Sequence, residues 1–263
     1  MKLITFNINS SNKYIEEDLN TLYSLNADIY CIQEFPEEKL DELILIFKSY
    51  SITTCREYFL TKQNSKKKSL KQLNIILSKY SFETIKKIPH IPMTRIPLLY
   101  KITLRANSSL IESHYVDIII NDKKIRLVNL HLECFIFPKF RIEQFKHLYT
   151  KATSNKEYDY IFFVGDFNIF AKPMYNWILA PFFQYSLKEV CINEYLAFEK
   201  ETSQRELQMH FPNSSTLKKI PIKCDGVISN MKYLKHQKNR IEVKRNLIKT
   251  SSDHYIIEVF LEI

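Results

Sequence analysis

The chain has 263 residues, of which 45% are hydrophobic, and its 38 lysines and arginines against 29 acidic residues give a formal net charge of +9. This length suits one large core, and we expect neither a membrane-spanning helix nor a signal peptide, because no run of 18 apolar residues occurs and the N-terminus leads directly into a strand-like segment. The positive charge favours polyanionic partners, either nucleic acid or an anionic membrane surface.

Cysteine usage bears on the compartment. The five cysteines are scattered and odd in number, and they form no Cys-x-x-Cys pair. This pattern argues against a disulfide framework and against a zinc site. We therefore expect a reducing compartment, either cytoplasmic or nuclear. The cysteines are Cys31, Cys55, Cys134, Cys191 and Cys224.

The first third of the chain alternates strand-like and helical patterns. Ile15, Leu19 and Leu22 are spaced i, i+4, i+7, which predicts an amphipathic helix with Asn12 as its N-cap. A second helix is predicted over residues 40–47. Strands are predicted over residues 3–6, 28–34, 52–60 and 73–78. The last two strands flank a lysine-rich segment that is most simply a solvated loop and secondarily a phosphate-facing one; it contains Lys66, Lys67 and Lys68.

The remaining two thirds of the chain continue this alternation. Residues 88–97 contain three prolines and are expected to be irregular. The pair Asn121-Asp122 predicts a hairpin turn, and residues 141–154 predict a helix. Further strands are predicted over residues 98–105, 113–120, 125–130, 161–164, 220–228 and 255–263, with a basic hairpin over 233–245. No repeat or linker interrupts the chain, so we expect a single domain over residues 1–263.

The stretch from Ile161 to Asn168 is the most informative. Four apolar residues predict a strand buried on both faces. The strand ends at Gly165, one of only two glycines, which is expected where the backbone turns tightly or approaches another group closely. In an extended backbone Asp166 and Asn168 would point the same way, and they could then hold a water and a phosphate oxygen. The alternative is an Asx-type turn after a strand.

Polar residues of the kinds used in phosphate chemistry recur at the ends of the predicted strands. If these strand ends share one edge, carboxylates, amides and two imidazoles converge there. Such a group suits one hard divalent cation and an activated water. The residues are Asn7, Glu34, His131, Asp166, Asn168, Asp225 and His254.

These segments match short motifs in a known order. The motifs are Thr5-Phe6-Asn7, Ile32-Gln33-Glu34, Asn74 to Ser78, Asn129-Leu130-His131-Leu132, Gly165-Asp166-Phe167-Asn168, Cys224 to Ile228 and Ser252-Asp253-His254. In this order the chain resembles the endonuclease/exonuclease/phosphatase superfamily, over essentially its whole length. The resemblance implies an α/β fold, a four-layer α/β/β/α sandwich in which two mixed β-sheets pack face to face with helices outside.

The resemblance also implies roles. Glu34 corresponds to the principal Mg²⁺ ligand, for which Mn²⁺ could substitute, with Asn7 beside it and Asp253 as a further metal or supporting group. Asp166 corresponds to the carboxylate that deprotonates the attacking water, and Asn168 to an amide that steadies the phosphate.

His254, oriented by Asp225, would contact the scissile phosphate. His131 would act on the leaving-group side, with Glu57 as its partner, and it argues against the apurinic endonuclease branch. Arg141 falls in the family's Arg-x-x-Gln pattern and is expected to bind substrate.

The leading hypothesis is a monomeric, Mg²⁺-dependent phosphodiesterase that acts on nucleic acid as a nuclease or an end-processing enzyme. Basic clusters would contact backbone phosphates without reading sequence. The alternative is a phosphoinositide phosphatase or a sphingomyelinase-like phosphodiesterase, for which a basic face that meets anionic phospholipid is equally useful. A degenerate binding module is disfavoured, because every matched position keeps a competent residue. The clusters are Lys66–Lys68, Lys218-Lys219 and Lys232 to Arg245.

Overall fold

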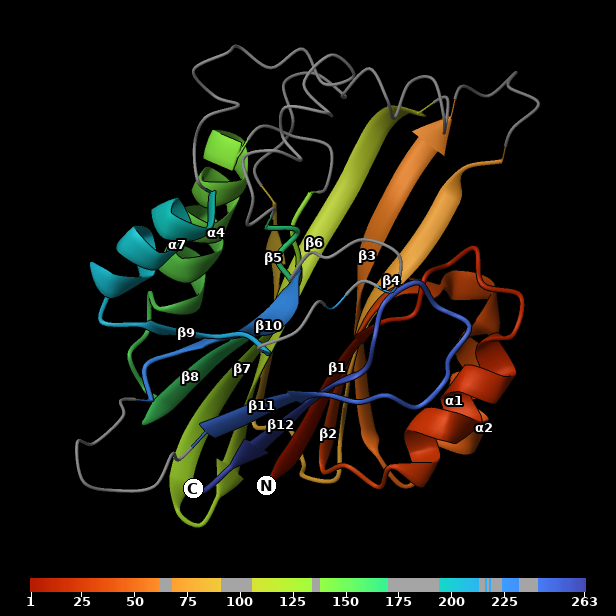
Figure 1. Ribbon diagram of the computed structural model, residues 1–263, viewed down its shortest axis with the longest axis horizontal. Coiled ribbons are helices and arrows are strands. Elements are labelled where there is room, and N and C mark those ends of the chain that lie inside the picture. The colour runs from red at the N-terminus through yellow and green to blue at the C-terminus, as the bar shows by residue number, and fades with distance from the viewer. Residues whose placement is uncertain are drawn as a thin grey trace.

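The computed structural model describes residues 1–61, 68–90, 106–133, 138–169, 194–212, 216, 218, 224–231 and 241–263. Strands make up the centre of the molecule and helices cover its two outer faces (Figure 1). The helices are α1 (Ile15–Ser24), α2 (Leu40–Ile46), α4 (Pro138–Ala152) and α7 (Glu194–Ser203), with a 3₁₀ turn, η1 (Glu37–Lys39), before α2. Within the described part of the chain, no helix has the length and apolar character needed to cross a membrane.

The strands form two sheets. The first sheet has the order β11-β12-β1-β2-β4-β3, and the second has the order β7-β8-β10-β9. The strands are β1 (Lys2–Asn7), β2 (Ile29–Pro36), β3 (Ser51–Thr61), β4 (Leu70–Ser78), β5 (Thr84–Pro89), β6 (Ala106–Ile120), β7 (Lys123–His131), β8 (Tyr160–Asp166), β9 (Gln208–His210), β10 (Asp225–Ser229), β11 (Ile241–Arg245) and β12 (Ile257–Leu261).

The long strand β6 joins the two sheets. Its first part, up to Ile111, pairs with β3. Its second part, from Glu112 onward, pairs with β5 on one side and β7 on the other. The hydrogen-bonded path is therefore continuous, and the two sheets are two halves of one folded ladder. The predicted hairpin turn after β6 is confirmed, because Asn121 and Asp122 have φ of 49° and 60°, the left-handed pair that a two-residue turn requires.

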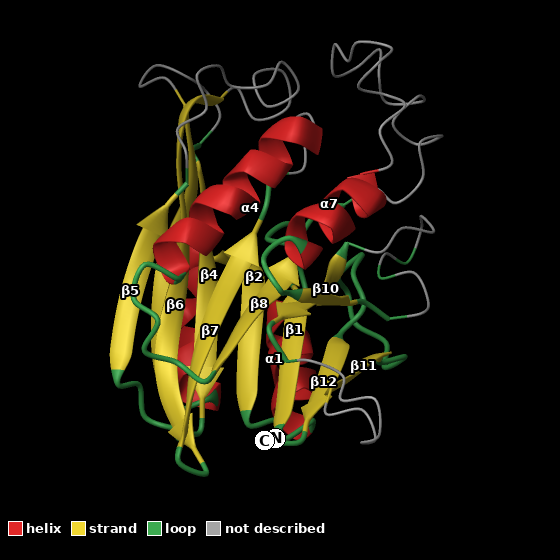
Figure 2. Cartoon of the chain, turned by 90° about the vertical axis from the view of Figure 1, so that its left-hand side faces the viewer, coloured by secondary structure: helices red, strands yellow, loops and turns green. Residues whose placement is uncertain are grey.

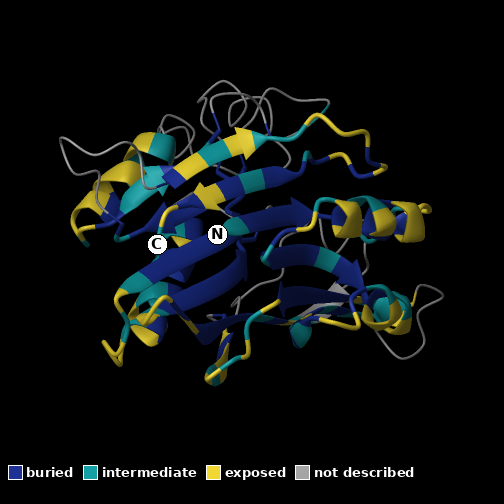
Figure 3. Ribbon diagram, turned by 90° about the horizontal axis from the view of Figure 1, so that it is seen from below, coloured by how far each residue is buried: buried dark blue, intermediate teal, exposed yellow. Residues whose placement is uncertain are grey.

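Three hydrophobic cores separate four layers. One core lies between the first sheet and the helices α1 and α2, and includes Leu19 and Leu43. A second fills the space between the two sheets, and a third packs α4 and α7 onto the second sheet through Phe145 and Phe198. Figure 2 shows α4 and α7 together over this sheet, and Figure 3 shows the buried strands between the more exposed outer faces. The expected α/β/β/α sandwich is confirmed.

Strand β8 has the doubly buried character that its sequence predicted. Phe162 and Val164 face the core between the sheets, whereas Ile161 and Phe163 face the core under α4 and α7. Successive side chains of a strand point to opposite faces, so a run of four apolar residues suits a strand covered on both sides.

Two local predictions near the N-terminus and the prolines are wrong. Asn12 does not cap the first helix: the side chain of Asn12 accepts a hydrogen bond from Tyr14 N at 2.8 Å and donates one to Asp18 Oδ2 at 2.7 Å, and α1 begins at Ile15.

The proline-rich segment is not irregular throughout, because its first two residues end strand β5. Pro89 is tolerated there since β5 is an edge strand that pairs with β6 alone.

Other predictions differ in extent or fall outside the described residues. The short strand β9 was not predicted, because three residues are too few to show a period-two pattern. The last five residues of the predicted basic hairpin form β11, which pairs with β12. The predicted strand over 98–105, residues 220–223 of the predicted strand over 220–228, and residues 232–240 of the basic segment lie outside the described residues. The described end of the strand over 220–228 forms β10.

Both glycines occupy tightly packed positions, as expected. Gly165 has a φ of +142°, and a Cβ atom built there would lie 2.0 Å from the backbone oxygen of Leu130 on the neighbouring strand β7. A Cβ atom at Gly226 would lie 2.7 Å from the ring of Phe211, which is a side chain and only partly buried. The backbone of β8 therefore needs glycine immediately before Asp166.

Replacing Gly165 should destabilise the fold. We expect Gly165→Ala to lower the free energy of unfolding by about 2 kcal/mol or more, because a positive φ is strained for alanine and a backbone carbonyl cannot move aside as a side chain can. Chemical denaturation followed by circular dichroism measures the change. Gly226→Ala is the matched control and should cost less, because the Phe211 ring can shift. A Gly165→Ala protein as stable as the parent would contradict this account.

Candidate active site

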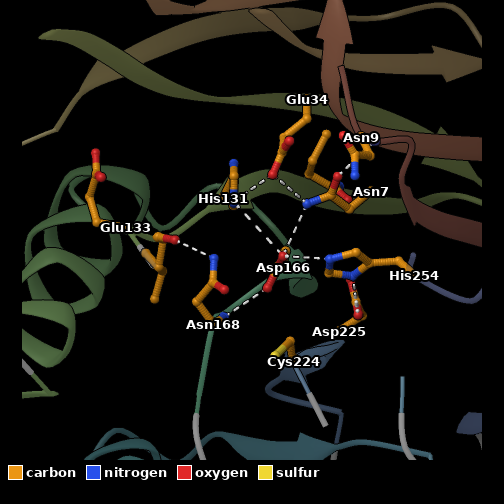
Figure 4. Close-up of polar contacts among 12 residues, drawn as sticks. Asn7, Asn9, Glu34, His131, Glu133, Asp166, Asn168, Cys224, Asp225 and His254 are labelled. Atoms are coloured by element: carbon orange, nitrogen blue, oxygen red, sulfur yellow. Dashed lines mark hydrogen bonds and ion pairs between the residues drawn. The ribbon is translucent and has the colours of Figure 1, made fainter. Parts of the chain in front are cut away.

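The strand directions bring the predicted site residues to one edge. β1 runs parallel to β2, and β7 runs parallel to β8, so the carboxyl ends of each pair lie together. β12 runs antiparallel to β1, and β10 antiparallel to β8, so the segments that precede or begin these strands reach the same edge. Figure 4 shows the resulting group. Its members on this edge are Asn7, Glu34, His131, Asp166, Asn168, Asp225 and His254.

Asp166 lies at the centre of the site. Its carboxylate is 1% exposed. Oδ2 lies 3.8 Å from Nε2 of His131 and 3.8 Å from Nε2 of His254 (Figure 4). The same oxygen accepts a hydrogen bond from Asn7 Nδ2 at 3.1 Å. The two imidazoles thus face one carboxylate oxygen at equal distances, which are longer than a direct hydrogen bond.

His131 is held by a glutamate on another strand. Nδ1 of His131 lies 2.8 Å from Glu57 Oε2, so the expected pairing of these two residues is present. Burial alone would lower the pKa of His131, but the charge and hydrogen bond of Glu57, together with the charges of Asp166 and Glu34, raise it well above its ordinary value. These contacts favour the protonated imidazole of His131, whose Nε2 lies 3.7 Å from Glu34 Oε1 and 3.8 Å from Asp166 Oδ2.

His254 has a corresponding partner. Its Nδ1 lies 2.9 Å from Asp225 Oδ2, and Asp225 is completely buried at the start of β10. Burial again opposes the charged imidazole, but the carboxylates of Asp225 and Asp166 outweigh it and raise the pKa of His254 to about 10. Each histidine therefore has one nitrogen fixed by a carboxylate and the other turned toward Asp166.

Glu34 lies beside this group in an unusual backbone conformation. Its φ is +54°, and the β2–β4 pairing shifts register between Ile32 and Phe35. Oε1 of Glu34 accepts a hydrogen bond from Asn7 Nδ2 at 2.9 Å and lies 3.7 Å from His131 Nε2. Positive φ is uncommon for glutamate, and such strain is concentrated at functional sites. The bulge turns the Glu34 carboxylate toward the strand ends.

The donor set around Glu34 fits a hard divalent cation. Glu34 offers carboxylate oxygens, which are ligands that Mg²⁺ prefers. Asn7 has an amide oxygen as well, but in this structure its Nδ2 faces Glu34 and its Oδ1 accepts the hydrogen bond of Asn9 N. Desolvation raises the pKa of Glu34, and a bound cation would stabilise its ionised form. Asp253 is exposed and accepts a hydrogen bond from Asn9 Nδ2 at 2.8 Å. Asn9 N in turn donates to Asn7 Oδ1 at 3.0 Å, which links Asp253 to this set.

Asn168 leaves strand β8 in a turn and not in an extended conformation. Its φ is +50°, and its backbone N–H donates to Asp166 Oδ1 at 2.8 Å. This is the Asx-type turn that was the alternative, so the expectation that the two side chains point the same way is wrong. Asn168 Nδ2 donates to the backbone oxygen of Leu132 at 2.7 Å. The turn fixes one oxygen of Asp166 and leaves Oδ2 directed at the imidazoles.

Arg141 lies in the interior of the fold. Its side chain is fully buried, and Nη1 donates to the backbone oxygen of Glu133 at 2.6 Å. This contact supports the segment after β7, and the binding of substrate by Arg141 stays a prediction. Gln144, from the same pattern, accepts a hydrogen bond from Glu133 N at 3.3 Å.

The predicted basic clusters are only partly described. Lys66 and Lys67 lie outside the described residues, whereas Lys68 is exposed just before β4. Lys218 has an internal role: its Nζ donates to the backbone oxygens of Thr250 and Ser252 at 2.6 Å each, in the segment that leads to His254. Lys218 is half-buried, and these hydrogen bonds engage its ammonium within the fold.

Several supporting residues were not predicted. Gln33 and Asn129 were noticed only as parts of motifs, yet Gln33 Nε2 donates to Asn129 Oδ1 at 2.8 Å between the two sheets. Gln72 and Asn74 on β4 donate to Glu34 and Glu57, each at 3.3 Å. The available signal was the pair of amides two positions apart in a largely apolar strand, a spacing that places both side chains on one face.

Comparison with known proteins identifies the fold. No protein-family model matches the chain, and no curated protein matches it in sequence. Among solved structures, an endonuclease/exonuclease/phosphatase family protein from Leptotrichia buccalis superposes with a TM-score of 0.66 at 13% identity, covering 100% of both chains. Beta toxin from Staphylococcus aureus gives 0.67 at 17% identity, also covering 100% of both.

A third similar structure comes from an animal. Truncated TDP2 from Caenorhabditis elegans superposes with a TM-score of 0.58 at 15% identity, covering 99% of this chain and 97% of that one. These superpositions cover nearly the whole chain at identities that carry the fold alone. The chain has the fold of the endonuclease/exonuclease/phosphatase proteins.

Proposed function

We propose that this protein is a metal-dependent phosphodiesterase that hydrolyses its substrate by in-line attack of water. The observation that carries the proposal is the position of Asp166 Oδ2, 3.8 Å from Nε2 of each of two histidines whose Nδ1 atoms are held by buried carboxylates. A carboxylate between two imidazolium donors suits a reaction that takes a proton from water and builds negative charge on phosphate oxygens.

Asp166 would act as the general base. Asn168 N holds its Oδ1 and Asn7 Nδ2 steadies its Oδ2, so the carboxylate is fixed before substrate binds. Neither imidazole bonds directly to Oδ2, which leaves that oxygen able to accept a proton from a water. A fixed base of this kind lowers the cost of orienting the nucleophile.

The two histidines would stabilise charge on the phosphate. His254 would donate its Nε2–H to an oxygen of the scissile group, with Asp225 holding the ring in orientation. His131 would act on the leaving-group side, with Glu57 in the equivalent position. Preorganised charged donors in a buried site are worth far more than the same donors in water.

Glu34 and Asn7 would hold a Mg²⁺ ion, with Mn²⁺ as a substitute and with Asp253 contributing through Asn9. When bound, the cation supplies positive charge to a phosphate oxygen. Asp166, Asp225 and His254 form another compact group of potential ligand atoms, all within 4.8 Å of one another. We assign that group to proton handling, because Asp225 already holds His254 at 2.9 Å.

Nucleic acid is the substrate class that we propose. The net charge of +9 supports a polyanionic substrate, since lysine and arginine that meet backbone phosphates release counterions on binding. Phospholipid with an anionic or zwitterionic headgroup is the competing class, because the same charge suits a membrane surface. The two classes differ in how binding depends on salt and on vesicles.

The first prediction from this proposed function concerns the protonation of His254. In the protein kept metal-free with chelator, we expect the His254 imidazole to stay protonated from about pH 6 to about pH 8, because Asp225 and Asp166 raise its pKa to about 10. Asp225→Asn removes the strongest raising charge and leaves burial, which lowers the pKa, so the variant should lose the proton at lower pH. Long-range ¹H–¹⁵N spectra of the imidazoles measure both states.

His114 provides an internal reference for that measurement. Burial lowers its pKa to about 3, so it should remain neutral over the same range. A His254 resonance that titrates near the ordinary value of histidine in the parent, or that does not change in Asp225→Asn, would contradict the assignment.

The second prediction concerns turnover. Asp166→Asn and His254→Ala should each lower kcat by roughly 10²–10⁴-fold at saturating Mg²⁺, because they remove the base and a charge-stabilising donor. The double variant should lose much less than the product of the two, since both serve one transition state. Glu34→Ala should instead raise the Mg²⁺ concentration needed for activity, and chelator should abolish turnover.

Asp41→Asn is the control for these variants, because Asp41 is exposed on α2, on the other side of the first sheet from α4 and α7. Steady-state kinetics over a Mg²⁺ series gives all the values. Near-normal turnover of Asp166→Asn on every substrate that the parent cleaves would refute the role of Asp166, and full activity of the parent in excess chelator would refute the metal.

The third prediction separates the substrate classes. Assays should find cleavage within a panel of single-stranded, double-stranded and 5′-blocked oligonucleotides, with binding that weakens steeply as salt rises. Lys68→Ala should spare kcat and reduce the slope of log K against log salt by about 0.9 on duplex DNA if Lys68 contacts a phosphate. Cleavage confined to soluble phosphoinositides or sphingomyelin vesicles would favour the phospholipid class instead.

A further inference from the structure

Strand β4 carries two buried amides on the face that looks into the molecule. Leu73 and Ile75 belong to the core under α1 and α2, whereas Ile76 belongs to the core between the sheets. The alternation of a strand therefore places Gln72 and Asn74 on the same side as Ile76. Both amides are almost fully buried, at 3% and 0% exposed. Buried amide donors need acceptors, and both amide nitrogens find one among the site carboxylates, whereas Asn74 Oδ1 has no hydrogen-bond partner among the described residues.

Gln72 holds the carboxylate of Glu34. Its Nε2 donates to Glu34 Oε2 at 3.3 Å and also contacts Ser10 Oγ. Glu34 Oε1 is held separately by Asn7 Nδ2 at 2.9 Å. Both oxygens are therefore oriented by neutral amides, one from β1 and one from β4. This support is needed because Glu34 sits in the bulge of β2, where the regular ladder does not fix it.

Asn74 holds the carboxylate of Glu57. Its Nδ2 donates to Glu57 Oε2 at 3.3 Å, the same oxygen that lies 2.8 Å from His131 Nδ1. The amide also lies 3.4 Å from the backbone oxygen of Glu112 on β6, which ties it to the strand that joins the two sheets. The direction of the His131 ring thus depends on an oxygen that Asn74 helps to fix.

We propose that Gln72 and Asn74 are positioning residues with separate tasks: Gln72 orients the metal-binding carboxylate of Glu34, and Asn74 orients Glu57 and through it His131. This inference rests on the proposed function. Supporting residues that hold metal ligands and catalytic histidines typically contribute 10–100-fold to affinity or activity.

The neutral character of the two amides suits these tasks. A lysine or arginine at either position would form an ion pair with the glutamate, and at Gln72 it would compete with a divalent cation for Glu34. An amide donates a hydrogen bond and adds no net charge. It fixes the direction of each carboxylate and leaves its charge for the cation or for the imidazolium.

Two variants of matched size test the two tasks. Gln72→Met and Asn74→Leu keep the approximate shape of each side chain and remove its N–H donors. Ile76→Val is the control, because Ile76 lies on the same face of β4 and packs in the core between the sheets, so its truncation mildly lowers stability and removes no hydrogen bond. Calorimetric titration with Mg²⁺ alone gives the dissociation constant. Hydrolysis of bis(p-nitrophenyl) phosphate at saturating Mg²⁺ gives kcat.

The expected results are opposite for the two amides. Gln72→Met should raise the Mg²⁺ dissociation constant by about 10-fold or more, with kcat at saturating Mg²⁺ within about 2-fold of the parent. Asn74→Leu should leave the dissociation constant unchanged and lower kcat by about 10–100-fold. Ile76→Val should change neither. If Gln72→Met fails to fold, Gln72→Asn replaces it, because its side chain is one methylene too short to reach Glu34, and it should raise the Mg²⁺ dissociation constant. If Asn74→Leu fails to fold, Asn74→Ser replaces it and should lower kcat.

Other outcomes would overturn the inference. Variants that lose metal binding and kcat together, in proportion to their loss of stability and in line with Ile76→Val, would indicate a merely structural role. Variants indistinguishable from the parent would show that the two hydrogen bonds are dispensable. A parent protein that neither binds Mg²⁺ nor hydrolyses the phosphodiester would instead refute the proposed function, a result that differs from failure of the variants alone.

Discussion

The hydrogen bond from Gln33 Nε2 to Asn129 Oδ1, 2.8 Å long, fixes the two sheets against each other at the site. Apolar packing between sheets is non-directional and would permit them to slide, whereas a buried amide pair has one satisfied geometry. Asn129 Nδ2 completes the bond network by donating to backbone oxygens on β2 and β4. Gln33 immediately precedes Glu34, and Asn129 lies two residues before His131. The same hydrogen bond therefore positions both Glu34 and His131. Every distance across the site depends on this register.

His254 reaches the site from an irregular segment and is fixed by other means. Both oxygens of Asp18, on helix α1, accept a hydrogen bond from Ser251 N, at 3.0 and 3.1 Å. Ser252 Oγ donates to the backbone oxygen of Asn7 at 2.7 Å. A loop that must hold a catalytic group within a fraction of an ångström needs such contacts on several sides. Helix α1 therefore contributes to the site although none of its residues lies in it.

The sequence predicted the layers and the strand ends because both follow from local patterns. A buried strand such as residues 161–164 is visible as an apolar run, and parallel and antiparallel pairing then brings its end to a common edge. The details that the sequence patterns do not show depend on non-local contacts. The left-handed backbone of Glu34 arises from a bulge against β4. The interior position of Arg141 depends on its contact with Glu133 in the segment after β7. Asn168 could equally have been extended, because Asp-x-Asn does not distinguish that conformation from a turn.

The charges of the site explain why a cation belongs with it. Four carboxylates meet two imidazoles, and the same contacts that raise the pKa values of both imidazoles keep them positive. With every carboxylate ionised, two negative charges remain uncompensated, and desolvation already raises the pKa of Glu34. A divalent cation matches this excess, and it would do so at Glu34, whose two oxygens accept hydrogen bonds from the neutral amides of Asn7 and Gln72. The four carboxylates are Glu34, Glu57, Asp166 and Asp225.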